Sequence, residues 1–158
     1  MFIDKMAELL KGKTIFLDVD GTLGEYRYNN HVCGDDGNGQ TYDELLFDDI
    51  FYRARPLKTM MELVSKLDSE NLYVLGASVT NYEIDQKYQW LAEHYPNIKR
   101  ENMIFVGASS IKSMTMKKYM ENLNLKPSDI VFIDDNHNSI KDAETNGFIS
   151  YHISSFIE

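Results

Sequence analysis

Residues 14–22 read Thr-Ile-Phe-Leu-Asp-Val-Asp-Gly-Thr, and this stretch is the most informative part of the chain. An apolar run typical of a buried strand ends at two carboxylates, Asp18 and Asp20, which are two positions apart. In an extended chain such residues point to the same side, so both can face one cavity. Gly21 permits a turn that a side chain would hinder, and Thr22 offers a hydroxyl. The pattern indicates a candidate nucleophile and proton carrier, although alone it also fits a strand ending in a solvated acidic turn.

A second apolar run far downstream also ends in carboxylates. Residues 130–133 read Ile-Val-Phe-Ile and are followed by Asp134 and Asp135. Parallel strands place their carboxyl ends at one edge of a sheet, where ligands bind, so we expect the four carboxylates to meet. A divalent cation relieves the repulsion in such a cluster, and Mg²⁺ suits a site of few carboxylates, waters and a substrate phosphate.

Length, charge and cysteine content narrow the class of protein. The chain has 158 residues, which predicts a single domain, 1–158, with room for one core. Its net charge of -9 and lack of a dense Lys/Arg run argue against a nucleic acid polymer as partner. Cys33 is the single cysteine, which excludes an intrachain disulfide and a cysteine zinc site and leads us to expect a cytoplasmic protein. Charges within residues 1–13 interrupt any signal-peptide core, and no apolar segment reaches membrane-spanning length, so we expect no membrane partner.

Short apolar runs alternate with segments of helical periodicity along the chain. This alternation predicts an α/β fold, a three-layer Rossmann-like core whose mostly parallel sheet is covered on both faces. Residues 24–55 are rich in turn formers and have little periodicity, so we interpret them as a small cap insertion after the first strand. The strands are expected at 14–18, 72–75, 103–106, 130–133 and 148–153.

These motifs, in this order, resemble the haloacid dehalogenase (HAD) superfamily of phosphohydrolases. The matching features are Asp-Val-Asp-Gly-Thr at 18–22, a hydroxyl residue near the end of the second strand, Lys112 at the head of a later helix, and the Asp134-Asp135 pair. The resemblance spans nearly the whole chain. It implies a HAD-like core and a magnesium-dependent phosphomonoesterase that works through an aspartyl-phosphate intermediate.

The resemblance also implies roles for the residues at the first strand end. Asp18 is similar to the nucleophile that attacks phosphorus, and Asp20 to the acid that protonates the leaving alcohol and then activates water. Thr22 matches the motif's threonine, expected to hold the loop and Asp20 at the substrate-binding side of the site. Lys112 is similar to the lysine that bridges the nucleophile and a phosphoryl oxygen.

The same resemblance implies a magnesium site. Its ligands are expected to be Asp18, Asp20 through its backbone carbonyl, and the pair Asp134 and Asp135, of which Asp135 is the better direct ligand. Magnesium there both offsets the carboxylates and screens the incoming phosphate.

The second motif, a serine or threonine that binds the transferring phosphoryl group, has more than one candidate. Residues 75–81 read Leu-Gly-Ala-Ser-Val-Thr-Asn. Ser78 is the first choice as a catalytic residue and Thr80 the second, as a substrate-binding residue, but one alignment places Gly76 where the hydroxyl belongs. If neither hydroxyl reaches the phosphate, backbone amides must bind it and turnover is expected to be slow.

Residues 85–94 resemble a segment of the 5'(3')-deoxyribonucleotidase-like branch, with Lys, Tyr and Trp at matching places. Trp90 at helical spacing is more often a core residue than a base-stacking one. The branch implies a small phosphorylated metabolite as partner, with a nucleoside or deoxynucleoside monophosphate as the leading substrate. The alternatives are a HAD phosphatase for another small metabolite and a weakly active or non-catalytic binding or regulatory protein. The sequence does not indicate the oligomeric state.

Overall fold

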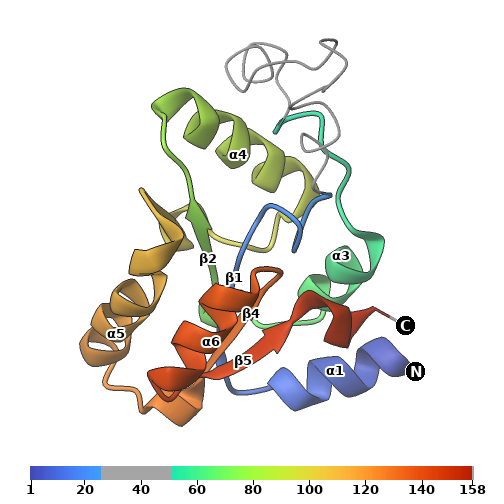
Figure 1. Cartoon of the computed structure of the whole chain (residues 1–158). Helices are drawn as coiled ribbons and strands as arrows, with labels where there is room; N and C mark the ends of the chain where they lie inside the picture. The colour runs from blue at the N-terminus through green and yellow to red at the C-terminus, as the bar shows by residue number, and fades with distance from the viewer. Residues whose placement is uncertain (26–50, 158) are drawn as a thin grey trace.

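Five short strands form one parallel sheet in the computed structural model, which describes residues 1–25 and 51–157 (Figure 1). The order across the sheet is β3-β2-β1-β4-β5, and every neighbouring pair is parallel. Because β1 is central, the loops that follow β1, β2 and β4 leave the same edge side by side. The strands are β1 (Thr14–Leu17), β2 (Leu72–Ala77), β3 (Met103–Val106), β4 (Ile130–Asp134) and β5 (Ile149–His152).

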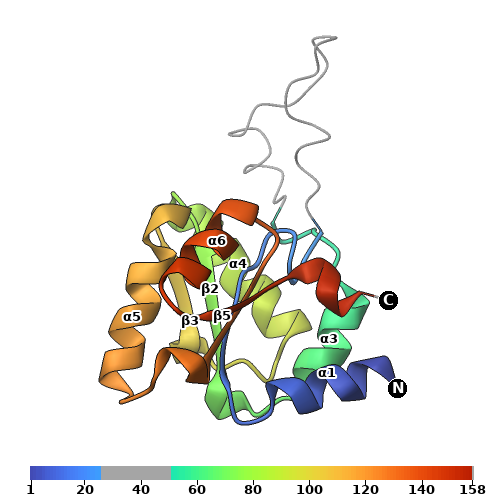
Figure 2. The ribbon, with the colours of Figure 1, turned by 60° about the horizontal axis from the view of Figure 1, so that its bottom comes forward.

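Helices cover both faces of this sheet (Figure 2). Successive side chains of a strand point to opposite faces, so Ile15 packs with Met60 of α3 on one side, whereas Phe16 packs with Met116 of α5 and Ala143 of α6 on the other. All four residues of β1 are buried, as expected for a central parallel strand. The helices are α1 (Phe2–Leu10), α3 (Lys58–Ser65), α4 (Asn81–His94), α5 (Lys112–Asn122) and α6 (His137–Thr145).

The predicted α/β architecture with a mostly parallel sheet is confirmed, with small changes at the strand ends. β1 ends one residue earlier than expected, at Leu17. β2 runs two residues further, to Ala77, because Gly76 and Ala77 pair with β3. No helix within residues 1–25 and 51–157 is long and apolar enough to cross a bilayer. Short 3-10 turns lie at Ser69–Asn71, Arg100–Asn102, Ser109–Ile111, Pro127–Asp129 and Ile153–Phe156.

The two ends of the expected cap insertion lie together against the core. The amide of Glu25 donates a hydrogen bond of 2.9 Å to the carbonyl of Arg55, and the side chains of these two residues form a salt bridge at 3.0 Å. The indole Nε1 of Trp90, on α4, donates to the carbonyl of Ala54 at 2.7 Å. A Cβ on Gly24 would lie only 2.9 Å from the Trp90 ring, so Trp90 is a core residue that fixes both ends. Most of the predicted cap, residues 26–50, lies outside the described residues.

Candidate active site

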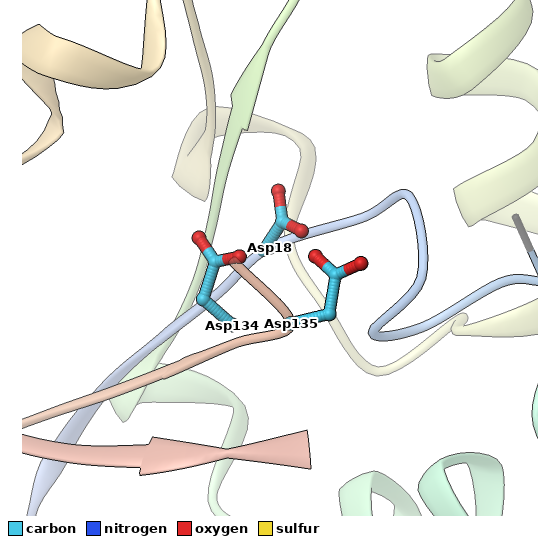
Figure 3. A group of neighbouring side chains, drawn as sticks. All are labelled: Asp18, Asp134 and Asp135. Atoms are coloured by element: carbon cyan, nitrogen blue, oxygen red, sulfur yellow. The ribbon is translucent and has the colours of Figure 1, made fainter. Parts of the chain in front are cut away.

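Three carboxylates gather where β1 and β4 end (Figure 3). Leu17 pairs with Ile133, so the next residues, Asp18 and Asp134, leave the sheet at the same level. Figure 3 shows their carboxylates and that of Asp135 pointing toward one another, and each offers an oxygen within 4.8 Å of the others. Asp18 and Asp134 are 7% and 1% exposed. The structure therefore brings three of the predicted metal ligands into one partly buried cluster.

Lys112 supplies positive charge to this cluster. It is the first residue of α5, and its Nζ donates to Asp18 Oδ1 at 2.8 Å and to Asp134 Oδ2 at 2.9 Å. Burial lowers the pKa of Lys112, but the two carboxylates outweigh burial and raise the pKa above its ordinary value. Lys112 is therefore a charged ammonium, placed where the sequence predicted a lysine beside the nucleophile.

The single ammonium of Lys112 does not balance the three carboxylates, so the cluster keeps an excess of negative charge. Burial raises the pKa of Asp18 well above its ordinary value, with Lys112 opposing this effect and Asp134 adding to it. Burial and the neighbouring Asp134 raise the pKa of Asp135 to about 6. A hard divalent cation is the chemical remedy, since oxygens that bind Mg²⁺ at about 2.1 Å lie at most about 4.2 Å apart, and the three carboxylates offer oxygens within 4.8 Å of one another. The donor set fits Mg²⁺, and Asp18, Asp134 and Asp135 are the side chains that can hold it.

The loop after β1 is folded tightly against the cluster. Gly21 has a φ of 82°, and a Cβ there would lie 2.1 Å from Asp135 Oδ2, so this position requires glycine. Thr22 is fully buried, and its Oγ1 donates to Asp18 Oδ2 at 3.2 Å. The structure thus places the Thr22 hydroxyl on the carboxylate of Asp18 and not on Asp20; its predicted contact with substrate stays a prediction.

Asp20 pairs through its carboxylate with a lysine of α4. Its Oδ2 accepts a hydrogen bond of 2.8 Å from Nζ of Lys87, on α4, and its carboxylate is not part of the three-carboxylate group. β1 ends at Leu17 and Gly21 has a positive φ, and the predicted shared cavity of Asp18 and Asp20 stays a prediction. The predicted role of the Asp20 backbone carbonyl as a metal ligand stays a prediction.

The candidates for the second motif have different surroundings. Ser78 directly follows β2, is 5% exposed, and its Oγ accepts from Lys87 Nζ at 2.9 Å. Thr80 is the N-cap of α4, where its Oγ1 accepts from the amide of Glu83 at 3.2 Å. Gly76 is still inside β2, and a Cβ there would press on the Phe105 ring at 3.2 Å. Ser78 is therefore the candidate hydroxyl linked to the Asp20 side of the site.

Sequence reasoning missed the roles of two residues at this edge. Lys87 was part of the segment that resembles the nucleotidase-like branch, yet its contact with Asp20 was not foreseen; its spacing of four from Glu83 was the available signal. His152, the last residue of β5, has Nε2 3.1 Å from the carbonyl oxygen of Asp135. His152 therefore ties β5 to the acidic loop.

Comparison with known proteins identifies the fold. No protein-family model matches the sequence, and a search of curated proteins finds no match. Among solved structures, a haloacid dehalogenase-like family hydrolase from Streptococcus pneumoniae matches with a TM-score of 0.60 and 15% identity, over 88% of this chain and 83% of that one. A HAD-family enzyme from Bacteroides thetaiotaomicron, in complex with magnesium and inorganic phosphate, matches with a TM-score of 0.53 and 15% identity over 89% and 93%. A D,D-heptose 1,7-bisphosphate phosphatase from Burkholderia thailandensis matches with a TM-score of 0.52 and 12% identity over 86% and 74%.

These likenesses define the class to which the fold belongs. The chain has the Rossmann-like α/β fold of the HAD hydrolases, and it carries a carboxylate cluster at the sheet edge where the strands end. At identities of 12 to 15% the likeness concerns the fold, so the activity rests on the side chains.

Proposed function

We propose that the protein is a magnesium-dependent phosphomonoesterase of the HAD superfamily that acts through Asp18. The observation that carries the proposal is the buried carboxylate of Asp18, placed between the Lys112 ammonium and the carboxylates of Asp134 and Asp135. A carboxylate with a cation beside it can serve as a nucleophile toward an anionic phosphate. The magnesium complex of the Bacteroides thetaiotaomicron enzyme, which shares the fold, supports the choice of cation.

The proposed reaction has two steps. A carboxylate oxygen of Asp18 attacks phosphorus and the bond from phosphorus to the alcohol oxygen breaks, while Asp20 gives its proton to that oxygen. Asp20 then takes a proton from water, whose oxygen attacks phosphorus and releases inorganic phosphate and free Asp18. Lys112 stays beside the carboxylates of Asp18 and Asp134 in both steps. Asp18, Asp134 and Asp135, with the backbone carbonyl of Asp20, would hold Mg²⁺, which would supply positive charge that offsets the carboxylates and the phosphate.

The substrate class follows from the resemblance of residues 85–94 to the deoxyribonucleotidase-like branch. A nucleoside or deoxynucleoside monophosphate is the leading candidate, and another small phosphorylated metabolite is the alternative. A panel of nucleotides and sugar phosphates decides between them, because a nucleotidase must prefer nucleoside monophosphates. The single cysteine favours a reducing cytoplasm as the compartment.

The test of the activity is phosphate release from an aryl phosphate with and without Mg²⁺. We expect turnover only with Mg²⁺, and we expect Asp18→Asn to abolish it while keeping the side chain's size. The matched control is Asp4→Asn, which removes the same charge from an exposed residue of α1. Activity retained in Asp18→Asn would refute the assignment.

A second candidate function is a binding or regulatory module with the same fold and little turnover. It is favoured by Gly76, which occupies one alignment of the second motif without a hydroxyl. This alternative predicts that Mg²⁺ and a phosphate analogue bind to the wild-type protein while no phosphomonoester is hydrolysed. Calorimetric binding and the substrate panel, run on the same preparation, separate the two functions.

A further inference from the structure

The ammonium of Lys87 is buried and has no role in the reaction described so far. Lys87 is 1% exposed, and its Nζ lies 2.8 Å from Asp20 Oδ2, 2.9 Å from Ser78 Oγ and 3.0 Å from Glu83 Oε1. An ammonium has three N–H donors, so these acceptors account for all of them. Lys87 therefore faces protein groups and not the substrate phosphate.

Lys87 carries a positive charge in this cluster. Burial lowers the pKa of Lys87, but Asp20 and Glu83 outweigh burial and raise it. Glu83 is itself buried and lies one helical turn before Lys87 on α4. Lys87 is therefore a charged group held on a rigid helix by one buried carboxylate, and its second short ion pair reaches across to the loop after β1.

The surroundings keep the contact between Lys87 and Asp20 fixed. The Phe51 ring centroid lies 4.6 Å from Lys87 Nζ, and Trp90 packs one turn further along α4. The space left between these side chains and Asp20 is about 10 Å³, the lower limit for a single water molecule. This side of the bond therefore has room for at most about one water molecule.

Only one oxygen of Asp20 takes part in this bond. Lys87 holds Oδ2, and the Asp20 side chain is 23% exposed whereas that of Lys87 is 1% exposed. A free aspartate side chain samples several rotamers, whereas a proton donor must lie about 2.6–3.2 Å from the atom that it protonates. An anchored Oδ2 restricts the rotamer, and the partly exposed carboxylate has a second oxygen that is not part of this bond.

We propose that Lys87 is a positioning residue that holds the Asp20 carboxyl toward the leaving oxygen; this inference rests on the proposed phosphomonoesterase function. Lys87 then acts through Asp20 and not on phosphorus. Removing Lys87 must lower kcat more for substrates whose leaving group needs a proton than for substrates whose leaving group departs as an anion. A merely structural residue would harm both equally.

The experiment compares phenyl phosphate with p-nitrophenyl phosphate, whose leaving group needs no proton. We expect Lys87→Met to lower kcat for phenyl phosphate at least about 10-fold more than kcat for p-nitrophenyl phosphate, within the range of general acid catalysis. The Mg²⁺ affinity, measured by calorimetry, should stay the same. Lys118→Met, on the exposed side of α5, is the matched control and should change neither rate.

A double-mutant cycle with Asp20→Asn gives the second readout. If Lys87 acts through Asp20, adding Lys87→Met to Asp20→Asn should lower the rate with phenyl phosphate by less than about twofold more. If the rate losses of the two single variants multiply in the double variant, the inference is overturned. It is also overturned if Lys87→Met lowers the rates with both substrates equally. In either case the phosphomonoesterase activity of the wild type stands. An inactive wild type would overturn the proposed function and the inference together.

Stability is controlled with a compensated variant. Lys87→Met leaves Glu83 as a buried charge without its lysine, so the variant is checked by circular dichroism and thermal melting. If it fails to fold, Glu83→Gln/Lys87→Met removes both buried charges and is tested with the same two substrates. Glu83→Gln alone keeps the bond between Lys87 and Asp20 and should keep the wild-type ratio of the two rates; a changed ratio would overturn the inference.

Discussion

Replacing Lys112 with methionine removes the ammonium that lies between Asp18 and Asp134. Both contacts are short, 2.8 and 2.9 Å, and all three groups are buried. Removing one partner of a buried ion pair costs about 3–5 kcal/mol of the free energy of unfolding. Asp18, whose pKa burial already raises, can take up a proton and limit the cost. We therefore expect about 3 kcal/mol, a fall of about 6–12 °C in Tm for a chain of this size.

The assay is thermal melting of Lys112→Met with EDTA and with Mg²⁺, beside kcat on an aryl phosphate. The loss of Tm should be largest in EDTA and smaller with Mg²⁺, because a bound cation replaces part of the missing charge. We expect kcat to fall by at least about 100-fold, as for loss of an electrostatic group at a developing charge. Lys118→Met, an exposed control, should change the free energy of unfolding by less than about 0.5 kcal/mol. Equal melting of the two variants would refute the role of Lys112 in supporting the cluster.

Three further predictions concern the backbone, the pH dependence and the core. Gly21→Ala should lower the free energy of unfolding by about 1–3 kcal/mol and abolish Mg²⁺ binding in calorimetry. Gly12 is the control, because it also has a positive φ but a Cβ there would meet nothing within 4 Å, so Gly12→Ala should show only the smaller backbone strain. Equal effects of the two substitutions would contradict the clash with Asp135. Since the pKa of Asp135 is raised to about 6 in the folded state, its contribution to stability is present below about pH 4 and lost as the pH rises through about 6. Melts in EDTA should therefore show this group favouring a higher Tm at pH 5.5 than at pH 7. The Tm increase caused by Mg²⁺ should be smaller at pH 5.5 than at pH 7, because protonated Asp135 cannot bind the cation; an increase independent of pH would argue against these ligands. Trp90→Phe removes the hydrogen bond to Ala54 and should cost about 1–3 kcal/mol in chemical unfolding while leaving Mg²⁺ affinity unchanged; a weakened Mg²⁺ affinity would contradict a purely core role.

The sequence was informative where local pattern and strand topology act together. Buried runs of β-branched and apolar residues marked the strands, and parallel pairing then placed Asp18 and Asp134 at one level. The resemblance to the HAD superfamily, together with the position of Lys112 at a helix start after β3, predicted that Lys112 lies beside Asp18, and the structure has this contact. In each case the deciding contact follows from regular secondary structure, whose geometry repeats from protein to protein.

The sequence was less informative where contacts depend on loop geometry or on long-range packing. The sequence predicted a role for Asp20 beside Asp18 but not its bond with Lys87, which is 67 positions away in the chain. The helical pattern of α4 shows which face is apolar. It cannot show that Lys87, on that helix, contacts Asp20 in the loop after β1 and Ser78 in the loop after β2. The strand extension through Gly76 likewise depends on pairing with Phe105, which only the folded sheet provides.

The joined ends of the insertion have an evolutionary consequence. The chain leaves the core at Glu25 and returns at Arg55, and hydrogen bonds, a salt bridge and Trp90 hold the two ends together. The entropy of closing a loop grows only slowly with its length, so residues between these anchors can be exchanged, lengthened or shortened at little cost to the sheet. The carboxylates of Asp18, Asp134 and Asp135 and the lysines Lys87 and Lys112 lie outside this segment, so a change in its length leaves them in place.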